Sequence, residues 1–501
     1  MKTHITTDKV LDIFNNLKKS AISSFRKWDI AKALKFIKAA GMFMYNFNVT
    51  YSDRDLDMLL KDISRKQWGL VSIENLDEKV VVFLDSFGWA NRGLTQQYVR
   101  GLLKNGYKVI YILHALNLSA SKSLLDEFKS YDNIETIVIE NNPNTDIQTT
   151  GKIIDILKEK KPSKILVHLN VNDVVLLMAI ANITGADIYN INLTDHAFWL
   201  GAGLIDYNFE FRDYGEKVSL EKRGLKKSQL IRMPFYPIMP ASSEFDEFPP
   251  LPDDAIIVFT GGSEYKMLGE NDMFFKLMDS VLSIAINVYI LVAGVPENSV
   301  FSSKVANMTH SSRVKLIGVR KDINEVFSHS DIYLSTFPFI GGLMSQFAAY
   351  NKLPILAYVG ADNSNTVETV ISNKVNRNIS RYSLENFHSY AEDLIKESAF
   401  RKNEGQKNYE AIMKEEDFNK NLAKAMNRID SEIDWYESSP DYEYMINFYL
   451  DNENKGLHSG LFILLKSLRW KSIKLLGKDI LPASLLVLQK GKNKLIRKFK
   501  S

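Results

Sequence analysis

Hydrophobic and polar positions alternate with a helical period at the start of the chain. Within residues 8–75, apolar side chains recur every three to four positions, most clearly at 31–40 and 56–63. This spacing predicts a small helical region over residues 1–76. Ser52 is predicted to cap the last of these helices, because its hydroxyl can accept from free amides while Asp55 reaches back. The alternative for Asp53 and Asp55 is a metal-binding Asp-x-Asp motif.

The pattern changes after residue 76 to short β-branched runs separated by segments of helix length. The runs lie at 80–84, 109–113, 134–139, 165–168 and 188–192. Continuous apolar strands that alternate with helices indicate a parallel sheet covered on both faces. We therefore expect a doubly wound, Rossmann-like domain over residues 77–247.

The same alternation restarts after a proline-rich linker at residues 248–254. The new runs lie at 256–260, 288–292, 314–317, 332–335 and 355–359. The sequence thus predicts an α/β fold of two doubly wound domains. The second would span residues 248–430, and a helical basic tail would follow at 431–501. Ligands are expected in the crevice at the carboxyl ends of the strands.

Composition narrows the functional classes. The chain has 501 residues, 45% hydrophobic and 25% charged, which is typical of a globular protein. It has no Cys, which excludes disulfides, thiolate metal sites and a Cys nucleophile. No apolar run approaches the roughly 18 residues of a membrane span, and the first residues do not resemble a signal peptide. We expect a cytoplasmic protein without a transmembrane helix.

Positive charge is concentrated in the tail. Residues 455–501 contain twelve Lys or Arg and one acid, Asp479, whereas the rest of the chain is net negative. Residues 460–476 are basic, carry Trp470 and show apolar side chains at helical spacing, a pattern typical of a helix in a membrane interface. We expect peripheral contact with the inner membrane face. The alternative is a docked helix with a solvated basic face, and no motif indicates nucleic-acid binding.

The first strand of the second domain leads into a candidate phosphate-binding turn. Gly261 and Gly262 allow close backbone approach, Ser263 and the amides around Tyr265 can hold phosphate oxygens, and Lys266 can neutralise a diphosphate. The turn matches neither a Walker loop nor Gly-x-Gly-x-x-Gly. The alternative is an ordinary glycine turn after a strand.

Further donor-site candidates follow two later strands. These are Val319 and Arg320 after 314–317, and Gly341, Gly342 and Ser345 after 332–335. Gly341 and Gly342 precede a predicted helix, whose amino end can bind a second phosphate. Two phosphate sites in one domain favour a nucleotide diphosphate. The alternative is that the glycine pair only allows tight packing of helix on strand.

A general base is sought on the opposite side of the crevice. General acid–base catalysis at neutral pH needs a group with a pKa near 7. Asp195 and His196 follow the fifth strand of the first domain, so Asp195 can orient His196 or act directly as the base. The alternative is a helix cap followed by a packed His. His168, inside an apolar strand, is expected to be a satisfied core residue. Weaker acceptor-side candidates are Asp85, which has strand termination as its alternative role, Asn91 and Arg92.

Residues 85–358 resemble a GT-B glycosyltransferase, in particular the catalytic half of O-GlcNAc transferase and related bacterial enzymes. Residues 85–94 are similar to the family's acceptor loop, and residues 198–207 resemble its Trp–Leu–Gly segment leading to an Asp–Tyr pair. Ser263, Tyr265 and Lys266 match the donor-diphosphate loop. Residues 332–354 match the nucleotide-binding strand and helix.

The resemblance implies that residues 77–247 form the acceptor domain and residues 248–430 the nucleotide-sugar donor domain of a metal-independent hexosyl- or N-acetylhexosaminyltransferase. It implies no cofactor beyond the nucleotide sugar, UDP being the favoured nucleotide. An inverting enzyme of this kind needs a base for the acceptor proton, for which Asp195 and His196 are the candidates, whereas a retaining enzyme does not. Its acceptor would be a glycan or a lipid-linked acceptor in cell-surface polysaccharide synthesis. The alternatives are a protein O- or N-glycosyltransferase, a nucleotide-sugar epimerase and a non-catalytic accessory subunit. The sequence departs from the family at Phe347, where many members keep an acid for the ribose, and at residues 342–344, which replace His-Thr-Thr. The donor sugar, acceptor, stereochemistry and oligomeric state stay open.

Overall fold

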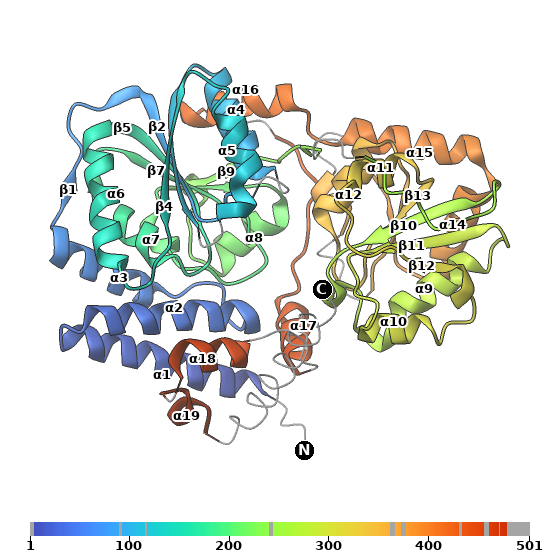
Figure 1. The fold of residues 1–501 in the computed structure, drawn as a ribbon, viewed down its shortest axis with the longest axis horizontal. Coiled ribbons are helices and arrows are strands. Elements are labelled where there is room, and N and C mark those ends of the chain that lie inside the picture. The colour runs from blue at the N-terminus through green and yellow to red at the C-terminus, as the bar shows by residue number, and fades with distance from the viewer. Residues whose placement is uncertain are drawn as a thin grey trace.

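A computed structural model describes most of the chain. The described residues are 5–89, 93–115, 118–239, 244–360, 366–371, 377–429, 433–454, 460–469 and 471–477. They form two α/β lobes that lie side by side, with several helices below the first lobe (Figure 1). We number helices and strands as in that figure.

Three helices begin the chain: α1 (Thr7–Arg26), α2 (Ile30–Phe47) and α3 (Arg54–Trp68). The predicted cap of α3 was wrong by one residue. Asp53, not Ser52, is the N-cap, because its extended backbone lets Oδ1 accept from Leu56 N at 2.9 Å. Lys18 pairs with Asp53 and Asp55 at 2.8 and 2.9 Å. Across the described residues, no group of three or more His, Asp or Glu is placed to hold a metal ion.

The first lobe contains a seven-stranded parallel sheet with the order β4–β3–β2–β5–β7–β8–β9. Its strands are β2 (Asp77–Asp85), β3 (Lys108–Ala115), β4 (Ile134–Glu140), β5 (Pro162–His168), β7 (Asp187–Ile191), β8 (Tyr207–Glu210) and β9 (Leu230–Arg232). Its helices are α4 (Leu94–Lys104), α5 (Lys122–Phe128), α6 (Asp146–Lys160), α7 (Val174–Ile180) and α8 (Asp213–Glu221). A small separate pair joins β1 (Val71–Ser72) to β6 (Ile183–Thr184).

The second lobe contains a six-stranded parallel sheet with the order β12–β11–β10–β13–β14–β15. Its strands are β10 (Ile256–Gly261), β11 (Val288–Ala293), β12 (Val314–Leu316), β13 (Ile332–Leu334), β14 (Ile355–Tyr358) and β15 (Ser380–Arg381). Its helices are α9 (Met273–Leu282), α10 (Val300–Val305), α11 (Ile323–Ser328), α12 (Gly342–Tyr350), α13 (Glu368–Ile371), α14 (Leu384–Lys396) and α15 (Ser398–Ala411). The prediction of two doubly wound parallel sheets is confirmed. The residue boundaries of the domains stay predictions.

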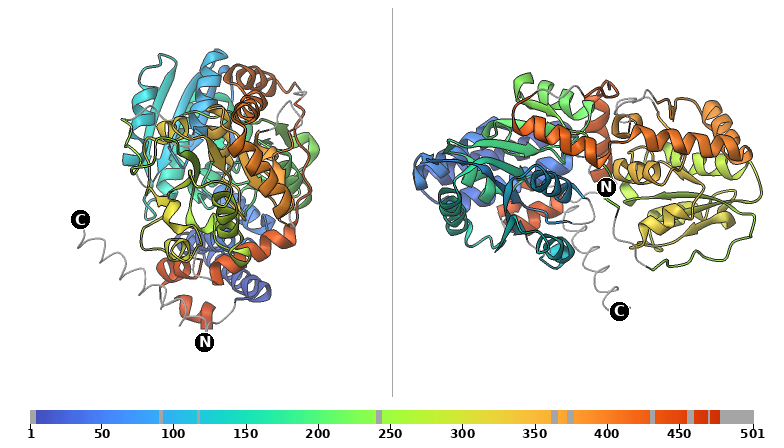
Figure 2. Two further views of the ribbon diagram at one scale, coloured as in Figure 1. Left: turned by 90° about the vertical axis from the view of Figure 1, so that its right-hand side faces the viewer. Right: turned by 90° about the horizontal axis from the view of Figure 1, so that it is seen from above.

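The chain then returns to the first lobe. Helix α16 (Glu415–Met426) packs against α4, and in the view from above it lies over the first lobe (Figure 2). Helix α17 (Tyr442–Asn454) follows at the junction of the two lobes (Figure 1). Helices α18 (Gly460–Leu468) and α19 (Lys471–Leu476) then pack against α2 and α1.

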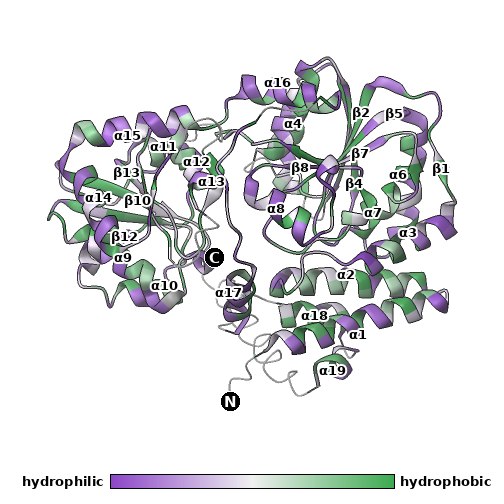
Figure 3. Cartoon of the chain, turned by 180° about the vertical axis from the view of Figure 1, so that it is seen from behind, coloured by the Kyte–Doolittle hydropathy of each residue, from purple (hydrophilic) through white to green (hydrophobic). Residues whose placement is uncertain are grey.

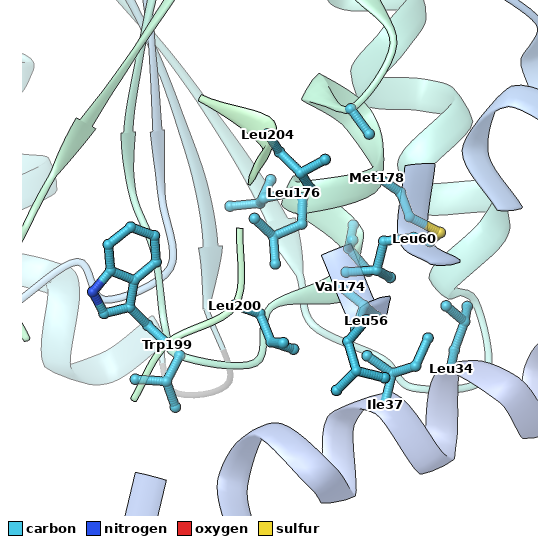
Figure 4. Packing of buried hydrophobic residues seen from close by; sticks show 14 of the residues in the cluster. Leu34, Ile37, Leu56, Leu60, Val174, Leu176, Met178, Trp199, Leu200 and Leu204 are labelled. Atoms are coloured by element: carbon cyan, nitrogen blue, oxygen red, sulfur yellow. The ribbon is translucent and has the colours of Figure 1, made fainter. Parts of the chain in front are cut away.

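One apolar cluster joins the amino-terminal helices to the first sheet. In Figure 4, side chains of α2 and α3 meet those of α7 and of the loop that contains Leu200. The close-up labels Leu34, Ile37, Leu56, Leu60, Val174, Leu176, Met178, Trp199, Leu200 and Leu204. Asp57 of α3 fixes this loop, accepting from Gly201 N at 2.7 Å and Gly203 N at 2.9 Å. The helical region is therefore an integral support of the loop at 199–204.

The same cluster covers the apolar face of α18. Figure 3 draws this helix mostly in the colour of hydrophobic residues, beside α2. Leu461, Leu464 and Leu468 are buried there, as a docked helix with a solvated basic face requires. Its exposed side includes Lys466 and Arg469. Trp470 and the basic residues beyond 477 lie outside the described residues. In the part of the chain described here, no helix combines the length and apolarity needed to cross a bilayer.

Candidate active site between the two sheets

Asp195 and His196 lie on the loop after β7, at the carboxyl edge of the first sheet. His196 Nδ1 is 3.1 Å from Asp195 Oδ1. Arg212, between β8 and α8, donates from Nε to Asp195 Oδ2 at 2.5 Å and from Nη2 to Oδ1 at 3.0 Å. No helix begins at Asp195, so the alternative of a helix cap is wrong.

Asp195 and His196, which we call the dyad, differ in basicity. Burial alone would raise the pKa of Asp195, but Arg212 and His196 hold the pKa of this carboxyl well below its usual range. Such a carboxylate is a poor proton acceptor at neutral pH. Burial lowers the pKa of His196 from its ordinary 6.5, against the opposing effect of Asp195. Its Nδ1 faces a carboxylate, so the proton belongs on Nδ1 and the lone pair on Nε2. This arrangement favours His196 as base and Asp195 as its orienting group.

The predicted phosphate turn follows β10 in the second lobe. Its backbone lies close to the neighbouring strand, since a Cβ at Gly294 would come within 2.8 Å of Gly262 O. The structure brings this turn together with the second glycine turn. Lys266 Nζ donates to Ile340 O at 3.4 Å, and Phe339 N donates to Lys266 O at 3.3 Å. Gly341 caps α12, so the amino end of that helix lies beside the lysine turn.

An aromatic contact connects the two lobes at this point. The Phe339 ring lies 5.1 Å from the His196 ring and 5.2 Å from Lys266 Nζ. Phe448 of α17 stacks on Phe339 at 5.5 Å, and Tyr449 lies 6.5 Å from His196. The predicted base and the predicted phosphate-binding lysine therefore meet the same ring from opposite sheets. The sequence placed Phe339 within the range 332–354 but gave its ring no role, and no motif marked α17 as part of the site.

Three predicted donor-site residues have other surroundings. Arg320 donates from Nε to Asp322 Oδ1 at 2.8 Å and from Nη2 to the backbone oxygen of Asp246 in the linker. Val319 is 84% exposed. Ser345 is fully buried in α12. In the described part of the chain, no hydrogen bond joins these three residues to the Lys266 turn. Their roles in donor binding stay predictions.

The position at which many GT-B enzymes keep an acid for the ribose holds a different side chain here. Phe347 is buried in the core of the second lobe. Gln346 donates from Nε2 to Val370 O at 3.0 Å and to Phe235 O at 3.2 Å. Its Oε1 is buried without a hydrogen-bond partner among the described residues. A carbonyl oxygen, rather than an acid, is thus available at this place.

Asp85 ends β2 and holds the loop that follows. It accepts from Phe87 N at 2.7 Å, Thr95 Oγ1 at 2.7 Å and Tyr111 OH at 2.8 Å, and lies 3.2 Å from His168 Nδ1. Burial would raise the pKa of Asp85, but His168 and these donors hold it below its usual value. His168 is buried as predicted, and its Nδ1 is paired, but its Nε2 has no hydrogen-bond partner in the described part of the chain, so the ring is satisfied at one nitrogen only. Asn91 and Arg92 lie outside the described residues.

Arg212 is the main residue that sequence reasoning missed. Besides holding Asp195, it donates from Nη1 to Thr369 Oγ1 of α13 at 3.3 Å, across the junction of the lobes. Its position after a short strand carries no motif, and its partner is 157 residues away. The arginine thus connects the dyad to the second lobe.

Replacing Arg212 with Met should lower the free energy of unfolding by about 3 to 5 kcal/mol, because the buried Asp195 carboxylate would lose its cation. Urea denaturation measures this change. Adding Asp195→Asn to the variant should restore part of the loss, and Arg54→Met, at an exposed site on α3, should change stability by no more than about 0.5 kcal/mol. Equal losses in the single and double variants would contradict the pairing.

Comparisons with known proteins agree with this architecture. No family model matches the sequence, and no curated protein matches it either. Among solved structures, a variant of Thermobaculum terrenum O-GlcNAc transferase is 13% identical, covers 88% of this chain and 83% of its own, and gives a TM-score of 0.50. Staphylococcus aureus TarM, also a variant, is 9% identical over 70% of this chain and all of its own, with a TM-score of 0.49. The lipopolysaccharide outer core galactosyltransferase WaaB is 13% identical over 70% of this chain and 99% of its own, with a TM-score of 0.46.

The chain therefore has the GT-B fold, with two doubly wound lobes whose strand ends face each other. At 13% identity this likeness concerns the fold. The expected resemblance to the GT-B architecture of O-GlcNAc transferase is confirmed at that level.

Proposed function

We propose that the protein is a glycosyltransferase that moves a hexosyl or N-acetylhexosaminyl group from a nucleotide diphosphate, UDP in the first place, to a hydroxyl acceptor. One observation carries the proposal: His196, held by Asp195, meets Phe339 from one lobe while Lys266 meets the same ring from the other. A base and a phosphate-binding cation on opposite sides of one crevice are what transfer from a diphosphate requires.

The donor would bind to the second lobe. Lys266, Ser263 and the amide of Tyr265 would hold one phosphate, Gly261 and Gly262 would allow its close approach, and the amino end of α12 at Gly341 and Gly342 would hold the other. Gln346 Oε1, buried without a partner, would accept from a ribose hydroxyl. The remaining candidates are Val319, Arg320 and Ser345, which we assign to the nucleoside end of the donor.

The acceptor oxygen would attack the anomeric carbon as the bond from that carbon to the diphosphate oxygen breaks. His196 Nε2 takes the acceptor proton, and the positive charge of Lys266 stabilises the departing diphosphate. Asp195 stabilises the imidazolium that forms. This assignment of the base corresponds to an inverting transfer.

The acceptor would be a glycan or a lipid-linked acceptor used for cell-surface polysaccharide, presented at the inner membrane face. This part of the proposal rests on the tail. Its described residues include Lys466, Arg469, Lys471 and Lys474, together with Ile473, as exposed side chains.

Replacing these four basic residues with Gln should reduce binding to vesicles that contain 30% anionic lipid, because each Lys or Arg contributes about 1 kcal/mol of binding free energy near such a surface. Co-sedimentation measures the change. Neutral vesicles are the lipid control, and four Lys→Gln changes at the exposed positions 35, 122, 276 and 402 are the protein control. Equal binding of wild type and tail variant would contradict a membrane role of this face.

The experiment for the proposed activity is nucleotide release from UDP-, GDP- and CMP-sugars, with and without oligosaccharide and lipid-linked acceptors. We expect UDP release that rises with acceptor. Conversion of a UDP-sugar to its epimer without acceptor would instead indicate an epimerase. Binding and turnover of none of the donors would indicate an accessory subunit.

A further inference from the structure

A small cavity of about 20 Å³ lies at the carboxyl ends of β5 and β7, next to the dyad loop. Its polar lining comes from Asn170, Asn190, Asn192, Thr194 and Trp199, and the other side chains around it are Leu and Ile. No charged side chain lines the cavity. Thr194 directly precedes Asp195, so the cavity shares a loop with the proposed base.

Two buried polar atoms of this lining have no hydrogen-bond partner among the described residues: Asn192 Oδ1 and Trp199 Nε1. Asn192 is 3% exposed and Trp199 is 7% exposed. In Figure 4 the indole nitrogen lies on the side of the ring that faces away from the apolar side chains. Leaving such an atom unpaired costs about 1 to 3 kcal/mol of folding free energy. Two such atoms in one small cavity therefore indicate a place for a bound group.

The surrounding structure fixes both atoms. Asn192 donates from Nδ2 to Glu210 Oε2 at 2.9 Å, which turns its Oδ1 away from Glu210. Ser219 Oγ and Asn208 Nδ2 both donate to Glu210 Oε1 at 2.5 Å, which leaves Oε2 as the acceptor for Asn192. The Arg223 guanidinium lies 5.1 Å from the Trp199 ring, and Leu200 N donates to Val171 O at 3.1 Å.

The unpaired atoms define the chemistry of the occupant. Trp199 Nε1 can only donate and Asn192 Oδ1 can only accept, so the complementary group both accepts and donates, as a hydroxyl does. The lining offers no cation to a phosphate or carboxylate and no carboxylate to an ammonium, since Arg223 packs on the Trp199 ring and is not among the lining residues. The volume suits one group of about the size of a water molecule.

We propose that this cavity binds one hydroxyl group of a neutral sugar acceptor and thereby places that sugar beside His196. The inference rests on the proposed function and goes one step beyond it, since it names an uncharged glycan, not a phosphorylated one, as the part of the acceptor next to the base. Asn192 and Trp199 are then specificity-determining residues of the acceptor site.

The test compares Trp199→Phe with wild type and with Trp435→Phe. Phe keeps an aromatic ring and removes only the N–H donor. Trp435 is the matched control, because its Nε1 is also buried without a partner and Arg232 lies 4.7 Å from its ring, outside the cavity. Saturation-transfer NMR with methyl hexopyranosides and with hexose 6-phosphates reports binding. We expect the neutral glycosides to bind wild type and Trp435→Phe alike, and Trp199→Phe about 5-fold to 10-fold more weakly, the value of one neutral hydrogen bond.

Neutral glycosides that bind Trp199→Phe as well as wild type, or binding of the phosphorylated sugars alone, would overturn the inference. A crystal structure of the wild type soaked with the same glycoside is the second measurement, which does not depend on the variant. A sugar hydroxyl in the cavity supports the inference, and an ordered water that stays in place contradicts it. UDP titration separates the acceptor-site inference from the proposed function. UDP binding without glycoside binding refutes only the acceptor site, whereas absence of UDP binding refutes the proposed function.

Discussion

Replacing His196 with Ala is expected to lower kcat for sugar transfer by about 10²-fold to 10⁴-fold, because the acceptor hydroxyl would lose its general base. Affinity for UDP should stay unchanged, since His196 belongs to the first lobe and the proposed diphosphate site to the second. Steady-state kinetics and UDP titration of the same preparation measure both quantities. The acidic limb of the wild-type pH profile should fall below pH 6.5, because burial lowers the pKa of His196 from that value and the base works only when unprotonated.

The control for this variant is His388→Ala, at a partly exposed site on α14. It should keep wild-type kinetics. Asp195→Asn should retain more activity than His196→Ala, because it removes the orienting carboxylate and leaves the imidazole. Full activity of His196→Ala would eliminate this residue as the base and favour a retaining transfer.

Replacing Lys266 with Ala is expected to weaken UDP binding by about 10-fold to 100-fold, the value of a hydrogen bond to a charged group. Turnover should fall further, because negative charge on the diphosphate increases as the glycosidic bond breaks. Calorimetric titration with UDP measures the first effect and nucleotide release the second. Lys266→Arg should restore part of the affinity by keeping the charge.

Lys276→Ala is the matched control, since this lysine is exposed on α9 of the same lobe. It should bind UDP as the wild type does. Equal affinities of Lys266→Ala and Lys276→Ala would mean that the Lys266 turn is an ordinary glycine turn after a strand, as the sequence alone also allowed.

The sheets were predictable wherever strands are buried on both faces. The apolar runs at 80–84 and 288–292 fall within β2 and β11. Strands β8, β9 and β15 were missed because they are short: β8 has four residues, which include Asn208 and Glu210, β9 has three and β15 has two. Such strands are stabilised by pairing with a neighbour that is already in place, which leaves little periodicity in the sequence.

The candidate site was predictable only within each lobe. Asp195, His196 and Lys266 follow strands directly, so chain position alone placed them at the carboxyl edges of the sheets. Arg212 and Phe339 act across the junction, and α17 joins them from a third segment. Contacts between segments more than a hundred residues apart depend on how the lobes pack, which local patterns do not encode.

A crystal structure of the protein with UDP tests the central claim most directly. The account predicts the diphosphate between the Lys266 turn and the amino end of α12, with the ribose near Gln346 and the β-phosphate directed toward His196. UDP bound elsewhere on the second lobe, or no UDP at a concentration that saturates wild-type turnover, would contradict it.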